Sequence, residues 1–421
     1  MYLVYLLRCD LRLSDNPVFH ALQNHPRYTH VLPLDIFPPS QIEVSGLVQP
    51  GVDAKSPFPE ARSRIGKFWR CGPHRAKFLA EGLWDLKSEL EALGSGLMMR
   101  VGHVDQVGRG LLQGGDEDFG KKVAGVWMTM DWASGELEQM RDVRAIVDKA
   151  GKGNVEWKVW DGEEILISTR AANLPDTFTS FRKRLEPLRH SVRPPLPRPA
   201  SLPPLPPSTP PQPHPFKLPD SLDKLIDRPL AASDLASTIP PPIGAKLAHL
   251  FTGGETQAHM RVKHFLSSGA MSTYKDTRNG LLGADFSTKL SGFLSHGFIT
   301  ACQIHAWMSE MPRPTKCRAN GAHWTNLLGT ARGEQGHRRR SIRAAMAGLH
   351  EAMHAESFIS ARAEFRRFQS GTTGTGLIDA SMREVYLTGY TSNCARQNAH
   401  PSSQNGSGST GACAQSGTSP C

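Results

Sequence analysis

The residues best suited to chemistry form one short cluster, Ser287-Thr288-Lys289-Leu290-Ser291. Three hydroxyl groups and one ammonium group lie within five positions, and the surrounding pattern predicts that the cluster opens a helix. The unpaired backbone N–H groups at the start of a helix favour anions. The cluster is therefore suited to hold a phosphate or pyrophosphate, although an ordinary helix cap of solvated polar residues explains the same five residues.

Two more polar side chains precede this cluster. Tyr274 and Arg278 lie four residues apart, so on a helix they would share one face. No Ser-His-Asp, Walker or GxGxxG arrangement is present, and none of the 17 histidines has the spacing of metal ligands. Glu255, which follows two glycines, is expected at the start of a helix.

The first 165 residues alternate between strand and helix signals. Leucines at helical spacing from Leu79 to Leu93, followed by Gly94, predict a helix that ends there, and another is expected from Ser134. Strands separated by helices predict a parallel sheet covered on both faces, and hence an α/β domain. The expected strands are 2–7, 29–37, 97–101, 123–129 and 155–159, and the tryptophans expected in the core are Trp127, Trp132, Trp157 and Trp160.

Proline dominates the next part of the chain, where residues 194–219 hold 13 prolines. This stretch predicts either a semi-rigid spacer, which we favour, or a loop wrapped over the surface; an SH3-type ligand is a third alternative. From about residue 240 the apolar spacing is helical throughout. The expected organisation is an α/β domain (1–165), a connector (166–240), a helical domain (241–398) with an atypical insert (312–356), and a low-complexity tail (399–421).

Composition narrows the classes of protein further. The net charge of +10 on 421 residues favours a polyanionic partner such as nucleic acid. Seven scattered cysteines without a CxxC pair favour a reducing compartment over a disulfide scaffold or zinc site. The apolar start is short and reads as a strand, and no run is long enough for a membrane helix. We therefore expect a soluble, intracellular protein without a membrane partner; the compartment stays open and a monomer is assumed.

A longer segment around the cluster resembles a known protein family. Residues 274–291, YKDTRNGLLGADFSTKLS, resemble the flavin-binding signature of the cryptochrome/photolyase family, and of its DASH branch in particular. Further segments resemble the same family in the same order along the chain. They are LLRCDLRLSDNPVF (6–19), GPHRAKFLAEGLWDLKSELEALGS (72–95), LPDTFTSFRKRLEP (174–187) and FQSGTTGTGLIDASMREVYLTGYTSNCARQN (368–398).

The resemblance implies a Rossmann-like α/β N-terminal domain and an all-α FAD-binding domain. It also implies a blue-light flavoprotein in which reduced FAD donates an electron to a cyclobutane pyrimidine dimer, preferably in single-stranded DNA. The implied enzyme is a deoxyribodipyrimidine photo-lyase, which cleaves carbon–carbon bonds, and the implied second cofactor is the antenna 5,10-methenyltetrahydrofolate. The net positive charge is consistent with a DNA partner.

Site residues follow from the resemblance position by position. It implies that Tyr274 and the run Ser287, Thr288, Lys289, Leu290 and Ser291 contact FAD, the run through the phosphates. Arg278 would line the DNA-facing rim, Asn393 would lie near the substrate, and Arg396 would lie on the flavin side. Asp131 is a weaker candidate for an antenna ligand. Asp379 also matches a family aspartate, although helix capping explains it as well.

Two regions depart from the family pattern. The stretch 312–356 replaces a segment with a Glu-x-x-Trp-Arg-Asp motif, and the chain ends before the Asp-x-Asp and Trp residues that hold the flavin ring and feed it electrons. The helical domain is therefore expected to be incomplete, and its electron-transfer tryptophans missing. We hypothesise that 312–356 and 399–421 are frameshifted or mis-spliced readings of a longer gene, which an uninterrupted transcript would contradict.

Three functions stay open at this point. The first is a light-dependent repair enzyme of DASH type, and the second is a blue-light photoreceptor of the same fold that does not repair DNA. The third is an inactive fragment that binds only nucleotide or nucleic acid. One fold serves all of these, so the site has to decide between them.

Overall fold

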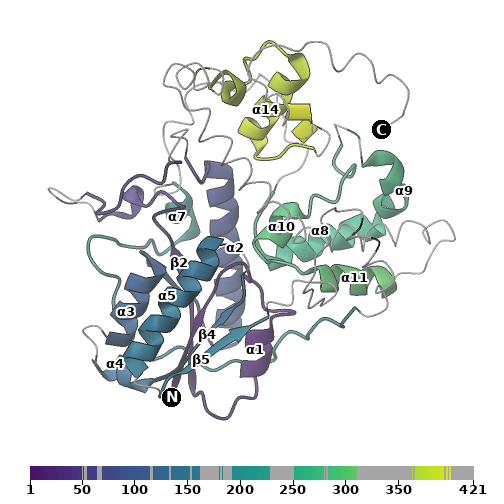
Figure 1. Ribbon diagram of the computed structural model, residues 1–421. Helices are drawn as coiled ribbons and strands as arrows, with labels where there is room; N and C mark the ends of the chain where they lie inside the picture. Colours follow the sequence, from purple (N-terminus) through teal and green to yellow (C-terminus); the bar gives the residue numbers. More distant parts are fainter. Residues whose placement is uncertain are drawn as a thin grey trace. The chain divides into compact units, whose positions relative to one another are not determined.

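The computed structural model describes part of the chain in two compact units. Unit 1 contains the described residues up to 227 together with 251–264 and 290–310, and unit 2 contains 265–289 and the described residues from 363 onward. Figure 1 shows the elements of both. The described residues are 1–49, 51, 55–63, 69–113, 117–131, 134–151, 154–161, 180, 183, 192–227, 251–278, 280, 283–310, 363, 366–392, 395–396 and 398–399.

A five-stranded parallel sheet forms the centre of unit 1, with strand order β3-β2-β1-β4-β5. All five strands expected from the sequence are confirmed, with ends shifted by a residue or two. β1 is the central strand because its apolar run is buried throughout. The strands are β1 (Tyr2–Leu6), β2 (His30–Phe37), β3 (Met98–Val101), β4 (Val123–Thr129) and β5 (Glu156–Trp160).

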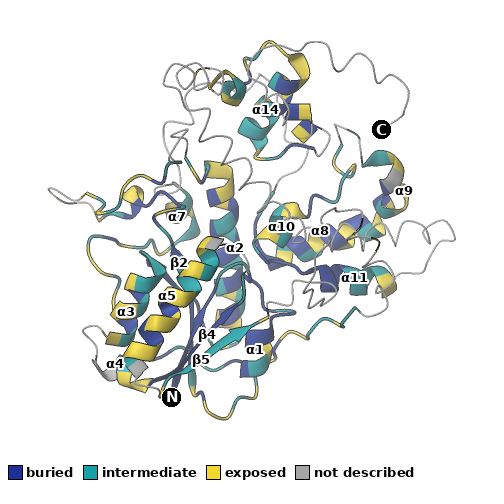
Figure 2. Ribbon diagram, viewed as in Figure 1, coloured by how far each residue is buried: buried dark blue, intermediate teal, exposed yellow. Residues whose placement is uncertain are grey.

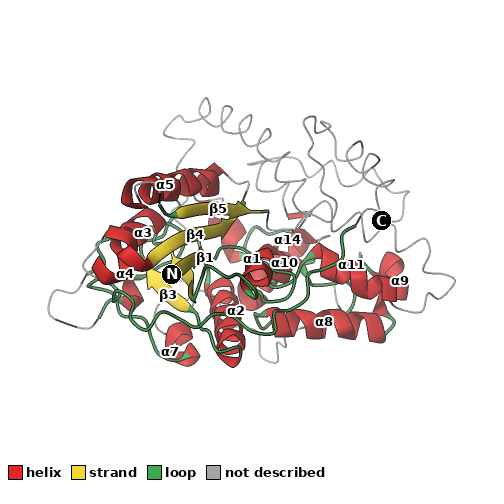
Figure 3. Cartoon of the chain, turned by 90° about the horizontal axis from the view of Figure 1, so that it is seen from below, coloured by secondary structure: helices red, strands yellow, loops and turns green. Residues whose placement is uncertain are grey.

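Helices cover both faces of this sheet, as Figure 3 shows. α3 (Val104–Gln113), α4 (Glu117–Lys122) and α5 (Ser134–Gly151) supply apolar side chains to one face. On the other side lie α1 (Pro17–Leu22), α2 (Pro73–Ala92) and α7 (Leu222–Asp227). The fold of unit 1 is therefore the α/β class that the sequence predicts.

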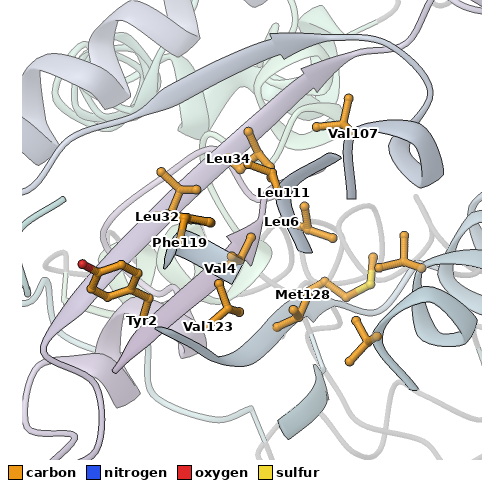
Figure 4. Close-up of a cluster of buried hydrophobic side chains, with 13 residues drawn as sticks. Tyr2, Val4, Leu6, Leu32, Leu34, Val107, Leu111, Phe119, Val123 and Met128 are labelled. Carbon is orange, nitrogen blue, oxygen red and sulfur yellow. The ribbon is translucent and has the colours of Figure 1, made fainter. Parts of the chain in front are cut away.

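The period of two in the central strand explains the core (Figure 4). Tyr2, Val4 and Leu6 point to the face that α3, α4 and α5 cover, where they pack against residues such as Val107 and Phe119. Tyr5 points to the opposite face, where its ring meets Phe19 of α1 edge-on. Exposed residues lie on the outer sides of the surrounding helices (Figure 2).

The described part of the proline-rich connector lies along the α/β domain. The Val31 N–H donates to the Pro204 carbonyl over 3.0 Å. The Gln212 amide pairs with both backbone groups of Val101, at 2.9 and 3.1 Å. For residues 192–227 the wrapped loop is thus confirmed and the spacer interpretation is wrong. The connector binds to the α/β domain because its groups hydrogen-bond backbone groups of β2 and β3 that no neighbouring strand among the described residues pairs.

Several helices from the second half of the chain also belong to unit 1. They are α8 (Glu255–Ser267, through His264), α10 (Ser291–Ser295) and α11 (Ala301–Glu310). Glu255 is the first residue of α8, as expected, and its buried carboxylate also accepts hydrogen bonds from Leu13 N (2.7 Å) and Ser14 N (3.0 Å). Unit 1 thus combines segments from both halves of the chain.

Unit 2 is helical in its described part. Its main helices are α9 (Ala270–Thr277) and α14 (Gly376–Thr388). Asp379, in the first turn of α14, accepts hydrogen bonds from Thr373 N (2.7 Å) and Gly374 N (2.9 Å), two residues that precede the helix, so its carboxylate fixes the turn that leads into α14. The stretch 312–356 and residues 400–421 lie outside the described residues.

None of the helices in the described part of the chain combines the length and apolar character that a membrane span needs. Among the described residues, Cys9, Cys71 and Cys302 form no disulfide. Of the four tryptophans expected in the core, Trp127 is fully buried, Trp157 and Trp160 are half-buried, and Trp132 lies outside the described residues.

Candidate functional site

The pair Tyr274 and Arg278 lies at the C-terminal end of α9. Arg278 is the C-cap residue, and its N–H donates to the Tyr274 carbonyl over 2.9 Å. Tyr274 is buried, which raises the pKa of its phenol, whereas the nearby Arg278 acts in the opposite sense. The spacing of four thus brings the two side chains into electrostatic range.

Within unit 2, Tyr390 contacts two residues of the Ser-Thr-Lys segment. Its hydroxyl lies 2.9 Å from the hydroxyl of Ser287. The Lys289 ammonium lies 4.4 Å from the centroid of the Tyr390 ring. Lys289 is 6% exposed and has a left-handed backbone with φ of +57°. A buried cation and a hydroxyl therefore contact the same aromatic residue, which lies about 100 positions downstream.

The end of α14 explains how Tyr390 reaches this segment. Gly389 caps the helix with φ of +71°, a conformation that glycine adopts without steric cost, and the chain turns there. The Thr388 hydroxyl then bonds both backbone groups of Tyr390 at 3.0 Å. Sequence reasoning missed Tyr390, although the residue lies inside the block 368–398 that resembles the family.

The last two residues of the cluster form the start of a short helix. Leu290 is the buried N-cap residue of α10 and Ser291 its exposed first residue, so the helix starts at the last member of the cluster and spans five residues. The left-handed backbone of Lys289 is incompatible with a helix that begins at Ser287. The expected helix start therefore lies at the end of the cluster, and Ser287, Thr288 and Lys289 precede the helix.

The two candidates near the end of the chain are only partly seen. Arg396 is exposed, and its backbone N–H donates to the Ser392 carbonyl over 2.9 Å. Asn393 lies outside the described residues. The structure thus brings Ser287 and Lys289 together with Tyr390.

Unit 1 offers a second place for a ligand at the carboxyl ends of its strands. The chain runs from β1 to β2 and β3 on one side and returns to β4 and β5 on the other, so the order reverses between β1 and β4. Open α/β sheets bind ligands at such a switch point. Arg8 and Asp10 follow β1, and the half-buried Asp131 follows β4.

At this switch point one hydrogen-bond donor, Arg8 Nη1, is buried without a partner among the described residues. The other terminal nitrogen, Arg8 Nη2, donates to the Glu136 carbonyl at 3.1 Å. Burial lowers the pKa of Arg8, and Asp131 acts against this effect. An anionic or carbonyl group of a ligand would satisfy the unpaired N–H.

A network of buried polar groups surrounds Asp10 next to the switch point. Asp10 accepts hydrogen bonds from the Arg8 N–H (2.8 Å) and the Thr129 hydroxyl (2.9 Å), and from the Tyr5 hydroxyl. Asp35 on β2 is also buried, and burial together with the charge of Asp10 raises its pKa to about 7. This network fixes the loop after β1.

Comparisons with known proteins identify the family. Residues 3–200 match the sequence profile of the family described as DNA photolyase, and residues 327–400 match that of the FAD-binding domain of DNA photolyase. A cryptochrome DASH of Gloeobacter violaceus is 30% identical over 93% of this chain and 70% of its own length. The chain belongs to the cryptochrome/photolyase family. Its curated relatives carry the name cryptochrome DASH.

More similar relatives of this family are longer than the chain. A Gibberella zeae protein named for cryptochrome DASH is 41% identical over 94% of this chain, and a Neurospora crassa protein named as mitochondrial cryptochrome DASH is 38% identical over 94%. The chain spans 62% and 59% of their lengths. The FAD-domain match starts at residue 327, inside the stretch 312–356 where we expected the resemblance to be interrupted.

Solved structures show the same fold. A Synechocystis cryptochrome covers 94% of this chain with a TM-score of 0.63 and 24% identity. A class III photolyase from Agrobacterium tumefaciens covers 95% with a TM-score of 0.61 and 19% identity. The expected fold, an α/β domain followed by a helical domain, is thereby confirmed. Within the described residues no group of His, Cys, Asp or Glu could hold a metal ion.

Proposed function

We propose that this chain is a blue-light flavoprotein that holds FAD in its helical part and uses light to repair cyclobutane pyrimidine dimers in single-stranded DNA. When bound, FAD supplies the light-driven electron chemistry, which no side chain can provide. The proposal depends chiefly on one observation: the buried Lys289 ammonium and the Ser287 hydroxyl both contact Tyr390, in a chain with a photolyase-type FAD domain.

The residues fit the phosphate part of FAD. A buried cation with neighbouring hydroxyls forms strong, charge-assisted hydrogen bonds with phosphate oxygens. We propose that Lys289, Ser287 and Thr288 hold the phosphates and that the buried Tyr274 packs against the cofactor. Leu290, Ser291 and Arg396 remain proposed contacts from the family resemblance.

DNA recognition is proposed for the positive groups near this site. Arg278 would contact phosphates at the rim, and Asn393 would lie near the dimer. A dimer has to leave the base stack before it can enter a closed site, and this costs least in a single strand. The net charge of +10 favours such a polyanion.

The antenna is proposed for the switch point of unit 1. The unpaired Arg8 Nη1 and the half-buried Asp131 offer one donor and one acceptor to a ligand there. Methenyltetrahydrofolate carries carboxylates and a hydrogen-bonding pterin, so both kinds of group would find a partner. A folate-loaded chain should therefore lose the ligand when Arg8 is replaced by methionine.

An absorption spectrum of the purified chain, after incubation with FAD and gel filtration, tests the first step. Retained flavin gives bands near ~450 nm, and light chemistry depends on that retention. The second step measures light-dependent loss of dimers from a thymine oligonucleotide, single-stranded and duplex, with a dark control. Flavin with repair supports the proposal, flavin without repair supports the photoreceptor alternative, and a colourless chain supports the fragment alternative.

A further inference from the structure

We propose that Tyr390 is a positioning residue that keeps Lys289 and Ser287 in the arrangement required for a diphosphate, and releases the Lys289 ammonium when that ligand binds. The inference rests on the proposed function, because it assumes that the ligand is the diphosphate of FAD. The inference adds Tyr390 to the site, a residue that lies outside the cluster 287–291 and that the motif does not include.

The first step concerns the cost of burying Lys289. An ammonium group removed from water needs a partner, and Lys289 is 6% exposed. Its Nζ lies 4.4 Å from the centroid of the Tyr390 ring, within the range in which the negative face of an aromatic ring attracts a cation. Tyr390 thus stabilises the charge at the site before any ligand arrives.

The second step concerns the backbone of the same residue. Lys289 has φ of +57°, a backbone conformation that residues other than glycine rarely adopt. Such a conformation persists only when the surrounding structure stabilises it. Tyr390 contacts both ends of this turn, through the hydroxyl of Ser287 at 2.9 Å and through the ammonium of Lys289. One side chain therefore supports the strained turn from outside.

The third step concerns the rigidity of Tyr390 itself. Gly389 ends α14 with a left-handed residue, and the Thr388 hydroxyl bonds the backbone N–H and carbonyl of Tyr390 at 3.0 Å. The ring is consequently presented from a fixed helix end. A support that is rigid before binding lowers the entropic cost of ordering the site.

The last step concerns what a ligand changes. A diphosphate attracts an ammonium group more strongly than a ring face does, because its charge is full and negative. Lys289 would then turn from the ring to the phosphate while the Ser287–Tyr390 hydrogen bond keeps the turn in place. The two contacts of Tyr390 thus have different roles, and variants can separate them.

The rate of Lys289 acylation in the flavin-free chain tests directly whether the Tyr390 ring holds the Lys289 ammonium. The chain is treated briefly with an N-hydroxysuccinimide ester of acetate, and mass spectrometry compares Lys289 with the exposed Lys149 of α5. Tyr390→Leu removes ring and hydroxyl but keeps apolar volume, and should acylate Lys289 at least about fivefold faster. Tyr390→Phe keeps the ring and should stay within about twofold of the wild-type rate. A rate in Tyr390→Phe as fast as that expected for Tyr390→Leu would overturn the role of the ring, even if Tyr390→Leu fails to fold.

FAD affinity is then measured by quenching of flavin fluorescence. Tyr390→Leu should weaken binding about tenfold, equivalent to ~1.4 kcal/mol. Tyr386→Phe, a matched change on α14, should leave affinity unchanged. Unchanged acylation in Tyr390→Leu overturns the inference, as does unchanged FAD affinity. If the wild-type chain binds no FAD, the proposed function fails instead, and the acylation rates still decide whether Tyr390 holds Lys289.

Discussion

Asp15 and Arg193, which are 178 residues apart in the sequence, form a two-pronged ion pair in unit 1. Arg193 Nη1 lies 2.6 Å from Asp15 Oδ1, and Nη2 lies 3.0 Å from Oδ2. Asp15 has no exposed surface and also accepts hydrogen bonds from the Leu196 N–H and the Thr300 hydroxyl. One carboxylate therefore joins the loop after β1, the connector and the segment before α11.

Loss of this ion pair should destabilise unit 1. Arg193→Met leaves the buried Asp15 carboxylate without its cation, and removing one partner of a buried pair costs about 3 kcal/mol. The free energy of unfolding in urea measures the effect. Arg144→Met, which breaks an exposed pair with Asp148 on α5, is the control and should cost less than about 0.5 kcal/mol. Equal losses for both variants would show that the Asp15 pair has no special weight.

The contact between Gly82 on α2 and Phe298 should not tolerate a methyl group. A Cβ at Gly82 would lie 2.0 Å from Phe298 Cζ, and Phe298 is fully buried. Gly82→Ala should therefore lower the free energy of unfolding by about 2 kcal/mol despite the better helix propensity of alanine.

Gly108 of α3 provides the matched control, since nothing lies within 4 Å of a Cβ built there. Gly108→Ala should raise the free energy of unfolding by about 0.5–1 kcal/mol. Thermal or urea unfolding of both variants compares the two positions. A Gly82→Ala chain as stable as the wild type would mean that Phe298 moves aside at little cost.

Asp35 should make the stability of unit 1 depend on pH. Its pKa is raised to about 7 in the folded chain, from an ordinary 3.8. Between these values the unfolded chain loses the proton and the folded chain keeps it, so stability falls as pH rises from about 4 to about 7. Asp35→Asn should consequently stabilise the chain by at least ~1 kcal/mol at pH 8, and by almost nothing near pH 4.

Urea unfolding of wild type and Asp35→Asn across this pH range measures the difference. Asp148→Asn, at an exposed position of α5, is the control and should change the free energy of unfolding by less than about 0.5 kcal/mol. A constant difference between Asp35→Asn and wild type would contradict the raised pKa.

Gln212 should protect the free edge of β3. Its side-chain amide takes the place of a neighbouring strand by bonding both backbone groups of Val101. Gln212→Ala should speed hydrogen exchange at the Val101 amide and cost about 1 kcal/mol in unfolding free energy. Gln106→Ala, at an exposed position of α3, serves as the control. Unchanged exchange at Val101 would show that water replaces Gln212 without loss.

The order of elements could be predicted from the sequence because its causes are local. The apolar run at residues 2–7 and the leucine spacing from Leu79 to Leu93 depend only on neighbouring residues, and β1 and α2 lie where these patterns indicate. The family could also be recognised from ordered motifs. The helical spacing of Tyr274 and Arg278 is local in the same sense.

Only the tertiary structure decided which distant residues meet. The sequence could not distinguish a free spacer from a wrapped connector. The difference depends on hydrogen bonds from the connector to the strand edges at Val31 and Val101, and these edges exist only in the folded chain. For the same reason Tyr390 escaped notice. Its role depends on the turn at Gly389 and on the left-handed Lys289, and a contact across about 100 residues leaves no periodic trace in either segment.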